Sequence, residues 1–175
     1  MGSEMCIRDS YIQHKKVLEL AAGLGLPSLV AAPYALKVFC SDYDAGAVNI
    51  MRKSAEHNGF INMTCGELNW QDSTRILRAD VVILSDINYD PKEFEILDQL
   101  IKKFMLSGST ILLSTPQRLV AKAFISKILP FCSYSEERTI LHKKESVPIS
   151  VFVLGNETNT PKTGVIIDAI NKPKK

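Results

Sequence analysis

Short apolar runs alternate with amphipathic segments along most of the 175-residue chain, and this alternation is the feature that most constrains its fold. Residues 15–20, 35–42 and 79–86 have the length and composition of buried strands. The last of these is apolar on both faces, as expected of a central parallel strand. Strands that alternate with helices predict an α/β fold with a mostly parallel sheet and helices on both faces.

Two of the predicted helices have clear start signals. The first is expected to begin after Asp44, a preferred N-cap residue, and to end at Gly59. The second is expected to begin after Asp90, with Pro91 at its first position and Glu93 at the capping-box position. Their apolar stripes comprise Val48, Met51 and Ala55 in the first helix, and Phe94, Leu97, Ile101 and Phe104 in the second.

The C-terminal part of the pattern predicts which strands form one side edge of the sheet. A further helix is expected to open at Pro116, because proline is favoured at the first helical position. Residues 132–141 and 149–155 then have the pattern of two strands with no helix between them, which predicts an antiparallel pair. The expected sheet therefore has seven strands and an antiparallel C-terminal pair.

Length and charge favour a single domain that spans residues 15–155. Residues 1–14 are interpreted as a leader outside the fold, and residues 156–175 as a polar tail with a short apolar island. Of 21 basic and 19 acidic residues, four lysines and two acids lie in this tail, so the rest of the chain carries 17 of each. That balance argues against a nucleic-acid partner.

Other classes of site and location are also disfavoured by the composition. No apolar run approaches the roughly 20 residues of a membrane span, and the first ten residues lack the apolar core of a signal peptide, so a cytoplasmic location is predicted. The four cysteines are scattered and are expected to be free and mostly buried. The three histidines form no cluster with metal-ligand spacing, so no metal site is predicted.

The segment "VLELAAGLGLPSL", residues 17–29, predicts a strand, a glycine loop and a helix. Gly23 and Gly25 keep the turn open, but Ser28 stands where a dinucleotide-binding loop has its third glycine. A ligand without pyrophosphate does not need that glycine. Glu19 at the strand end disfavours a phosphate and suits a cationic or amino group. A plain strand–helix turn remains the alternative interpretation at this point.

Polar and aromatic residues follow the other strands, where ligands of such folds bind. Asp42 is placed to accept both hydroxyls of a ribose, since Asp44 already serves as the helix cap. Trp70 is placed either to stack on an adenine ring or to pack against the core. Asp86 follows a buried strand and needs a partner or a cationic substrate, and Tyr89 is expected in the same cleft.

These motifs, in this order, resemble the class I seven-strand S-adenosylmethionine-dependent methyltransferases. Within that class they resemble the protein-lysine methyltransferases marked by D-x-x-Y after the fourth strand. The matching pieces lie between residues 16 and 155 and are "VLELAAGLGLPSL", "SDYD", "LNW", "DINY" and "STPQR". The resemblance implies a Rossmann-like fold, S-adenosyl-L-methionine as cofactor, a protein lysine as methyl acceptor, and no metal.

The resemblance also implies roles for individual residues. Asp86 and Tyr89 face the methyl acceptor as catalytic residues, where a carboxylate and a phenol hold the amine and desolvation lowers its pKa. Within the cofactor site, the alanines and glycines line the methionine end, the aspartate binds the ribose and the tryptophan packs near the adenine. The implied cofactor-binding residues are Glu19, Ala21, Ala22, Gly23, Gly25, Asp42, Tyr43, Trp70 and Ser85.

Two departures from the family pattern keep other functions open. Ala21 replaces the first family glycine, so the loop is expected either to have ordinary backbone angles there or to bind more weakly. Family members carry a substantial segment before the first strand, whereas only residues 1–14 precede it here. The alternatives are a catalytically weak or inactive interaction module and a small-molecule methyltransferase. A nicotinamide-dependent oxidoreductase is disfavoured by Pro27 and Ser28, which do not suit a pyrophosphate.

Overall fold

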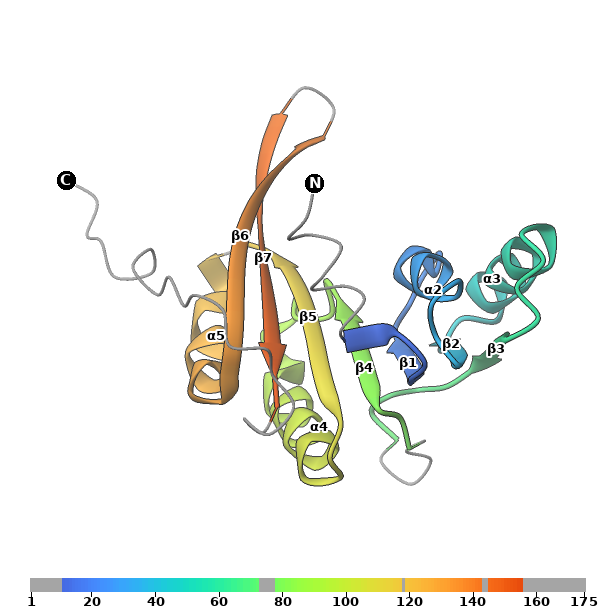
Figure 1. Ribbon diagram of the computed structural model, residues 1–175. Helices are drawn as coiled ribbons and strands as arrows, with labels where there is room; N and C mark the ends of the chain where they lie inside the picture. The colour runs from blue at the N-terminus through green and yellow to red at the C-terminus, as the bar shows by residue number, and fades with distance from the viewer. Residues whose placement is uncertain (1–10, 73–77, 118, 143–144, 156–175) are drawn as a thin grey trace.

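The computed structural model describes residues 11–72, 78–117, 119–142 and 145–155. Residues 1–10 of the predicted leader and the predicted tail at 156–175 lie outside these residues. The described chain forms one seven-stranded sheet in the order β3-β2-β1-β4-β5-β7-β6 (Figure 1). The predicted α/β fold is therefore confirmed, including the number of strands.

Strands β1 to β5 run parallel to one another, and β7 runs antiparallel to both β5 and β6. This arrangement confirms the antiparallel C-terminal pair. The strand bounds are β1 Lys16–Leu20, β2 Lys37–Asp42, β3 Met63–Glu67, β4 Val81–Ser85, β5 Thr110–Pro116, β6 Cys132–His142 and β7 Glu145–Leu154.

Helices cover both faces of the sheet, as predicted. Helices α2 (Leu26–Ala31) and α3 (Ala45–His57) pack on one face, and α4 (Phe94–Leu106) and α5 (Lys122–Ile128) pack on the other (Figure 1). None of the helices within the described residues is both long and apolar enough to cross a membrane.

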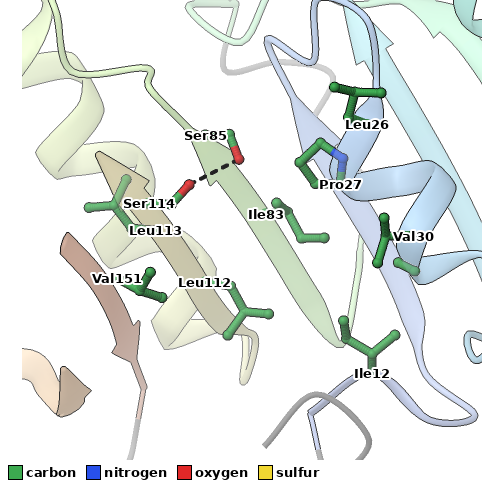
Figure 2. Close-up of a pocket in the computed structure, with 11 residues that line it drawn as sticks. Ile12, Leu26, Pro27, Val30, Ile83, Ser85, Leu112, Leu113, Ser114 and Val151 are labelled. Atoms are coloured by element: carbon green, nitrogen blue, oxygen red, sulfur yellow. Dashed lines mark hydrogen bonds between the residues drawn. The ribbon is translucent and has the colours of Figure 1, made fainter. Parts of the chain in front are cut away.

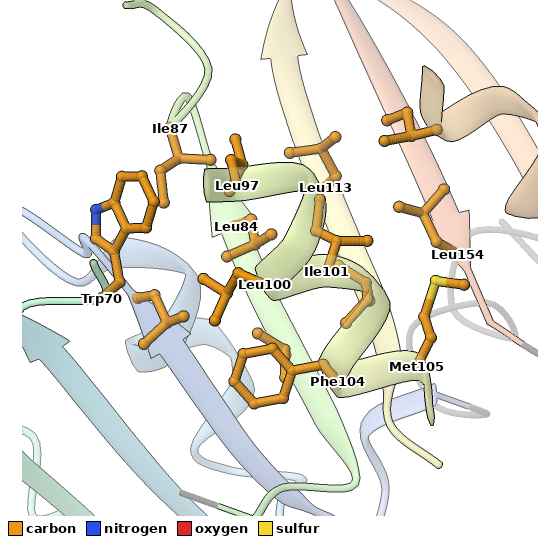
Figure 3. Packing of buried hydrophobic residues seen from close by; sticks show 14 of the residues in the cluster. Trp70, Leu84, Ile87, Leu97, Leu100, Ile101, Phe104, Met105, Leu113 and Leu154 are labelled. Atoms are coloured by element: carbon orange, nitrogen blue, oxygen red, sulfur yellow. The ribbon is translucent and has the colours of Figure 1, made fainter. Parts of the chain in front are cut away.

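Alternate residues of the central strands supply two separate cores. Leu84 of β4 faces α4, whereas Ile83 faces the side of α2 and α3, because successive strand residues point to opposite faces. Figure 3 shows the larger core between α4 and the sheet, and all seven residues of the two predicted helix stripes are buried. Tyr11 and Ile12, placed in the predicted leader, are also buried, at 3% and 7% exposure, in the core beside α2.

The two predicted helix starts are correct in position but differ in detail. The Asp44 carboxylate accepts a hydrogen bond of 2.7 Å from the N–H of Ala47, as an N-cap does. Asp90 likewise accepts from Lys92, but the first turn, Pro91–Glu93, is a 3₁₀ helix. The predicted capping box at Glu93 is wrong, because its carboxylate accepts instead from the Gln71 side chain at 2.6 Å.

The helix predicted to open at Pro116 begins later. Pro116 is the last residue of β5 and pairs with Ile149 of β7, and α5 starts only at Lys122. The antiparallel ladder explains the difference, because pairing with β7 carries the chain further as a strand. The N–H of Gln117 continues that ladder by donating to the carbonyl of Pro148 at 3.1 Å.

Candidate functional site

The loop after β1 has left-handed backbone angles at three residues, with φ values of 51° at Ala21, 55° at Gly23 and 68° at Gly25. Of the two alternatives for Ala21, ordinary backbone angles are therefore excluded, and weaker binding of the ligand stays a prediction. This conformation costs an alanine about 1–2 kcal/mol. Surrounding hydrogen bonds fix the turn, because Ala22 donates to the carbonyl of Ser41 at 3.0 Å and Gly25 donates to that of Ala22 at 2.8 Å.

The two glycines of this loop face different surroundings. A Cβ atom on Gly25 would lie 2.9 Å from the sulfur of Cys40 and 3.0 Å from that of Met51, so only glycine fits there. A Cβ atom on Gly23 would meet nothing within 4 Å. Gly25 is therefore packed against the β2 and α3 side chains, whereas the loop is open to a ligand at Gly23.

Asp42 joins this loop to the end of β2. Its carboxylate is only 6% exposed, and its two oxygens accept hydrogen bonds of 2.8 Å from the N–H of Gly23 and 3.0 Å from that of Asp44. An ionised carboxylate has about four acceptor positions, so two remain after these bonds. That remaining capacity suits the pair of hydroxyls that a ribose presents.

Glu19 lies beneath the loop, and its side chain is fully buried. One oxygen accepts from the N–H of Ser28 in the first turn of α2 at 2.9 Å, and the other has no hydrogen-bond partner among the described residues. Burial raises the pKa of this carboxyl from 4.5 to about 7, although hydrogen bonds from Ser28 and Cys40 offset part of the rise. In this structure the group holds the start of α2.

Asp86 ends β4 in a left-handed conformation, with φ of 53°. Its side chain is exposed, and its N–H donates to the carbonyl of Ser114 on β5 at 2.8 Å. Strands β1 and β4 are neighbours, with Leu20 paired to Leu84, so Ala21 and Asp86 turn the chain away at adjacent strand ends. Left-handed residues other than glycine are uncommon, and two at one sheet edge mark it as a candidate site.

Tyr89 and Tyr43 are both largely exposed, at 59% and 71%, and lie at the same edge of the sheet. Partial desolvation raises the pKa of the Tyr89 phenol, and negative charge on Glu93, Tyr43, Asp90 and Asp42 raises it further. Strands β2 and β4 both pair in parallel with β1, so their carboxyl ends lie at the same end of the sheet. The structure thus brings the predicted acceptor residue Tyr89 near the predicted cofactor residues Asp42 and Tyr43.

Trp70 is packed in the core, which was one of its two possible positions. The side chain is 8% exposed and lies beside Ile87 at the edge of the cluster formed with α4 (Figure 3). A contact with the adenine of a cofactor remains a prediction.

Asn88 was missed by sequence reasoning. It is 1% exposed, and neither its amide nitrogen nor its amide oxygen has a hydrogen-bond partner among the described residues. Leaving such a group unpaired costs about 1–3 kcal/mol, so an asparagine here is unusual. The sequence signal that could have identified Asn88 was its position inside "DINY", between the two predicted acceptor residues.

Ser85 faces a hollow on the α2 side of the sheet. Its hydroxyl accepts from the Ser114 hydroxyl at 3.2 Å, and both residues line a space of about 380 Å³ (Figure 2). The other walls are apolar and come from α2, β4, β5, β7 and the start of the chain. They consist of Ile12, Leu26, Pro27, Val30, Ala31, Ile83, Leu112, Leu113 and Val151.

The described residues contain no group of three or more histidine, cysteine, aspartate or glutamate side chains that could hold a metal ion, and the absence of a metal stays a prediction. Cys40, Cys65 and Cys132 are free, as predicted, although only Cys40 is buried, and Cys6 lies outside the described residues.

A family model and several curated proteins match this chain. A family model described as lysine methyltransferase matches residues 3–130, beginning inside the predicted leader. The histone-arginine methyltransferase METTL23 of Homo sapiens is 28% identical over 88 residues, covering 46% of this chain and 46% of the relative. The Xenopus laevis METTL23 is 32% identical over 87 residues, covering 46% and 37%. The matches therefore span less than half the length of these curated relatives.

Solved structures share the fold at low identity. The N-methyltransferase NodS from Bradyrhizobium japonicum WM9, in complex with S-adenosyl-L-homocysteine, superposes with a TM-score of 0.68 at 11% identity, covering 87% of this chain and 85% of that one. An rRNA methylase from Streptococcus thermophilus gives a TM-score of 0.65 at 12% identity, covering 87% and 93%. These similarities show a Rossmann-like methyltransferase fold.

Proposed function

Because the chain belongs to the lysine methyltransferase family, we propose that it transfers a methyl group from S-adenosylmethionine to a lysine of a protein. The family match supports S-adenosylmethionine as the cofactor, and a structural neighbour that holds the demethylated product has the same fold. The observation that carries the proposal is the Asp42 carboxylate, which is bonded to the open glycine loop and keeps two acceptor positions.

Four of the predicted cofactor residues have a proposed task that their geometry supports. Asp42 holds the ribose, while Ala21, Ala22 and Gly23 line the methionine end of the cofactor. The bound cofactor supplies a methyl group already activated by its positive sulfur. The chain's own contribution is to align the acceptor nitrogen with that methyl group and to exclude water around it.

Asp86 and Tyr89 are proposed to hold the acceptor amine. The Asp86 carboxylate is exposed directly after β4, at a residue with left-handed backbone, and its negative charge attracts a cationic side chain. The Tyr89 phenol is protonated at neutral pH, as a phenol ordinarily is, and its pKa is raised further, so it is suited to orient the amine by hydrogen bonding rather than to act as a charged base.

Arginine is the second candidate acceptor, favoured by the names of the METTL23 relatives. A carboxylate at Asp86 attracts either cation. A lysine amine loses its proton far more readily than a guanidinium does, which favours lysine at a site with one carboxylate and one phenol. Mass spectrometry of proteins incubated with methyl-labelled cofactor separates the two, because the label is then found on lysine or on arginine.

Calorimetry with S-adenosyl-L-homocysteine tests cofactor binding. The proposal expects binding that is lost in Asp42→Ala, and it fails if the wild type and the variant bind equally or not at all. An interaction module that binds the cofactor without transferring methyl groups remains the alternative. Transfer of a labelled methyl group to any acceptor by this chain would argue against that module. The cytoplasmic location stays a prediction.

A further inference from the structure

Strands β6 and β7 continue together beyond the rest of the sheet. Pairing between β5 and β7 ends at Pro116 with Ile149, whereas β6 and β7 remain paired for four further residue pairs, from Thr139 with Pro148 to His142 with Glu145. At about 3.3 Å per residue, this two-stranded ribbon extends roughly 13 Å past the last residue of β5. Figure 1 shows it standing clear of the body of the molecule. We call residues 139–142 and 145–148 the β6–β7 ribbon.

The β6–β7 ribbon extends from the end of the sheet at which the parallel strands have their carboxyl ends, and the candidate acceptor site lies at that same end. Pro116 is the last residue of β5, and Ser114 lies two positions before it. Ser114 pairs with Ser85 of β4, which directly precedes Asp86. The connection after β5 fastens the base of the ribbon. Gln117 donates from its backbone N–H to the Pro148 carbonyl at 3.1 Å and from its side chain to the Ser150 hydroxyl at 3.2 Å.

Large apolar side chains are exposed on the β6–β7 ribbon and on the connection at its base. Ile140 is 48% exposed and Leu141 is 76% exposed, and as neighbours on a strand they point to opposite faces of the ribbon. Leu119 and Val120, just after the fastening residue Gln117, are 79% and 48% exposed. Single exposed apolar residues are ordinary, but adjacent ones on both faces of a projecting ribbon, with two more on the connection that follows Gln117, offer apolar area on which a protein can pack.

The charge at this edge specifies what kind of protein segment fits. Asp86 is exposed at the carboxyl end of β4, which is separated from β7 by β5 in the sheet, and negative charge on Glu93 and Asp90 contributes to the raised pKa of Tyr89. A bound segment therefore meets carboxylates at the acceptor site and apolar side chains at the ribbon. Its matching chemistry is a basic residue accompanied by hydrophobic neighbours.

We propose that the β6–β7 ribbon docks the methyl-accepting protein, with hydrophobic residues of that protein packed on Ile140 and Leu141 while its basic side chain reaches Asp86. The inference rests on the proposed function and adds the surface that selects a protein over a small amine. The ribbon contributes binding energy away from the reacting atoms, so its residues affect the affinity for the protein acceptor and leave the cofactor site unchanged.

The test compares the double variant Ile140→Asp/Leu141→Asp with the wild type on the protein fraction of a desalted cell lysate and methyl-labelled cofactor. We expect protein labelling to fall at least tenfold, with unchanged affinity for S-adenosyl-L-homocysteine. On the most strongly labelled protein, once purified, the variant should raise KM at least tenfold and change kcat less than threefold. Leu106→Asp is the matched control, because Leu106 is 89% exposed at the end of α4, near the opposite edge of the sheet, and should label like the wild type.

Equal protein labelling by the double variant and the wild type would overturn the docking proposal while leaving the proposed function intact. A fall in kcat with unchanged KM would also overturn it, since that result places the ribbon in the chemical step. The conservative variant Ile140→Leu/Leu141→Ile should retain labelling, which separates loss of the apolar surface from loss of the fold. If the wild type binds the cofactor product but labels no protein, the proposed function fails, and the docking proposal fails with it.

Discussion

The backbone N–H of Gly23 donates a hydrogen bond of 2.8 Å to the buried carboxylate of Asp42, which fastens the glycine loop after β1 to the end of β2. The other carboxylate oxygen accepts from the N–H of Asp44, where α3 begins. One side chain thus positions the glycine loop, and we propose that the same carboxylate accepts hydrogen bonds from the ribose of the cofactor. Loop geometry and cofactor binding should therefore fail together when this carboxylate is removed.

Asp42→Ala is expected to weaken binding of S-adenosyl-L-homocysteine at least 100-fold, as measured by calorimetry. The variant loses the anchor of the loop and the ribose acceptors, and hydrogen bonds to charged groups contribute about 1.5–3 kcal/mol each. Asp44→Ala is the control, since it removes only a helix cap worth about 1 kcal/mol and should bind nearly normally. Equal losses in the two variants would show that Asp42 acts only through the fold.

Ala21→Gly is expected to stabilise the protein by about 0.5–1 kcal/mol in urea unfolding. Glycine removes the left-handed strain at φ of 51°, although it also makes the unfolded chain more flexible and so offsets part of the gain. The opposite result is expected for Ala47→Gly within α3, where glycine should cost about 1 kcal/mol. Destabilisation by Ala21→Gly of the same size would contradict the left-handed angle.

Gly25→Ala should destabilise the protein much more than Gly23→Ala does. Both positions have positive φ, so each substitution incurs a strain of about 1–2 kcal/mol. Only the Cβ atom at position 25 also collides with the sulfur atoms of Cys40 and Met51, which adds an overpacking cost of about 1–3 kcal/mol. Urea unfolding of the two variants side by side measures the difference, and equal losses would mean that the loop repacks freely.

From the raised pKa of Glu19 we predict that the free energy of unfolding falls as the pH rises towards neutrality. Its folded-state pKa of about 7 lies above the ordinary value of 4.5, so the folded protein binds the proton more tightly than the unfolded chain. The resulting stabilisation is complete below pH 4.5 and is lost as pH rises through 7, a change on the order of 3 kcal/mol. Urea unfolding between pH 4.5 and 8 should show a weaker decline for Glu19→Gln, whose amide still accepts from Ser28. Identical pH profiles would exclude a protonated Glu19.

Much of the fold was predictable because strands and helices here follow local patterns. The caps at Asp44 and Asp90 and the apolar stripe from Phe94 to Phe104 depend on neighbouring residues, and the structure has them where the sequence indicates. The Pro116 helix start failed because pairing with β7, distant in sequence, extends the strand.

The site was less predictable, since tertiary contacts determine its details. The left-handed angle of Ala21 is fixed by hydrogen bonds from the loop to β2, which no local rule for alanine anticipates. Glu19 was expected near a cationic ligand, and its burial under α2 depends on how the loop folds over it. The unpaired amide of Asn88 likewise becomes visible only once the packing around it is known.

The most direct test of the account is transfer of a labelled methyl group from S-adenosylmethionine to lysates by the wild type, Asp86→Asn and Tyr89→Phe. We predict that the wild type labels lysine residues of proteins and that each variant labels them at least tenfold less, while all three proteins bind S-adenosyl-L-homocysteine alike. Label confined to small molecules, or variants that label protein as well as the wild type does, would contradict it.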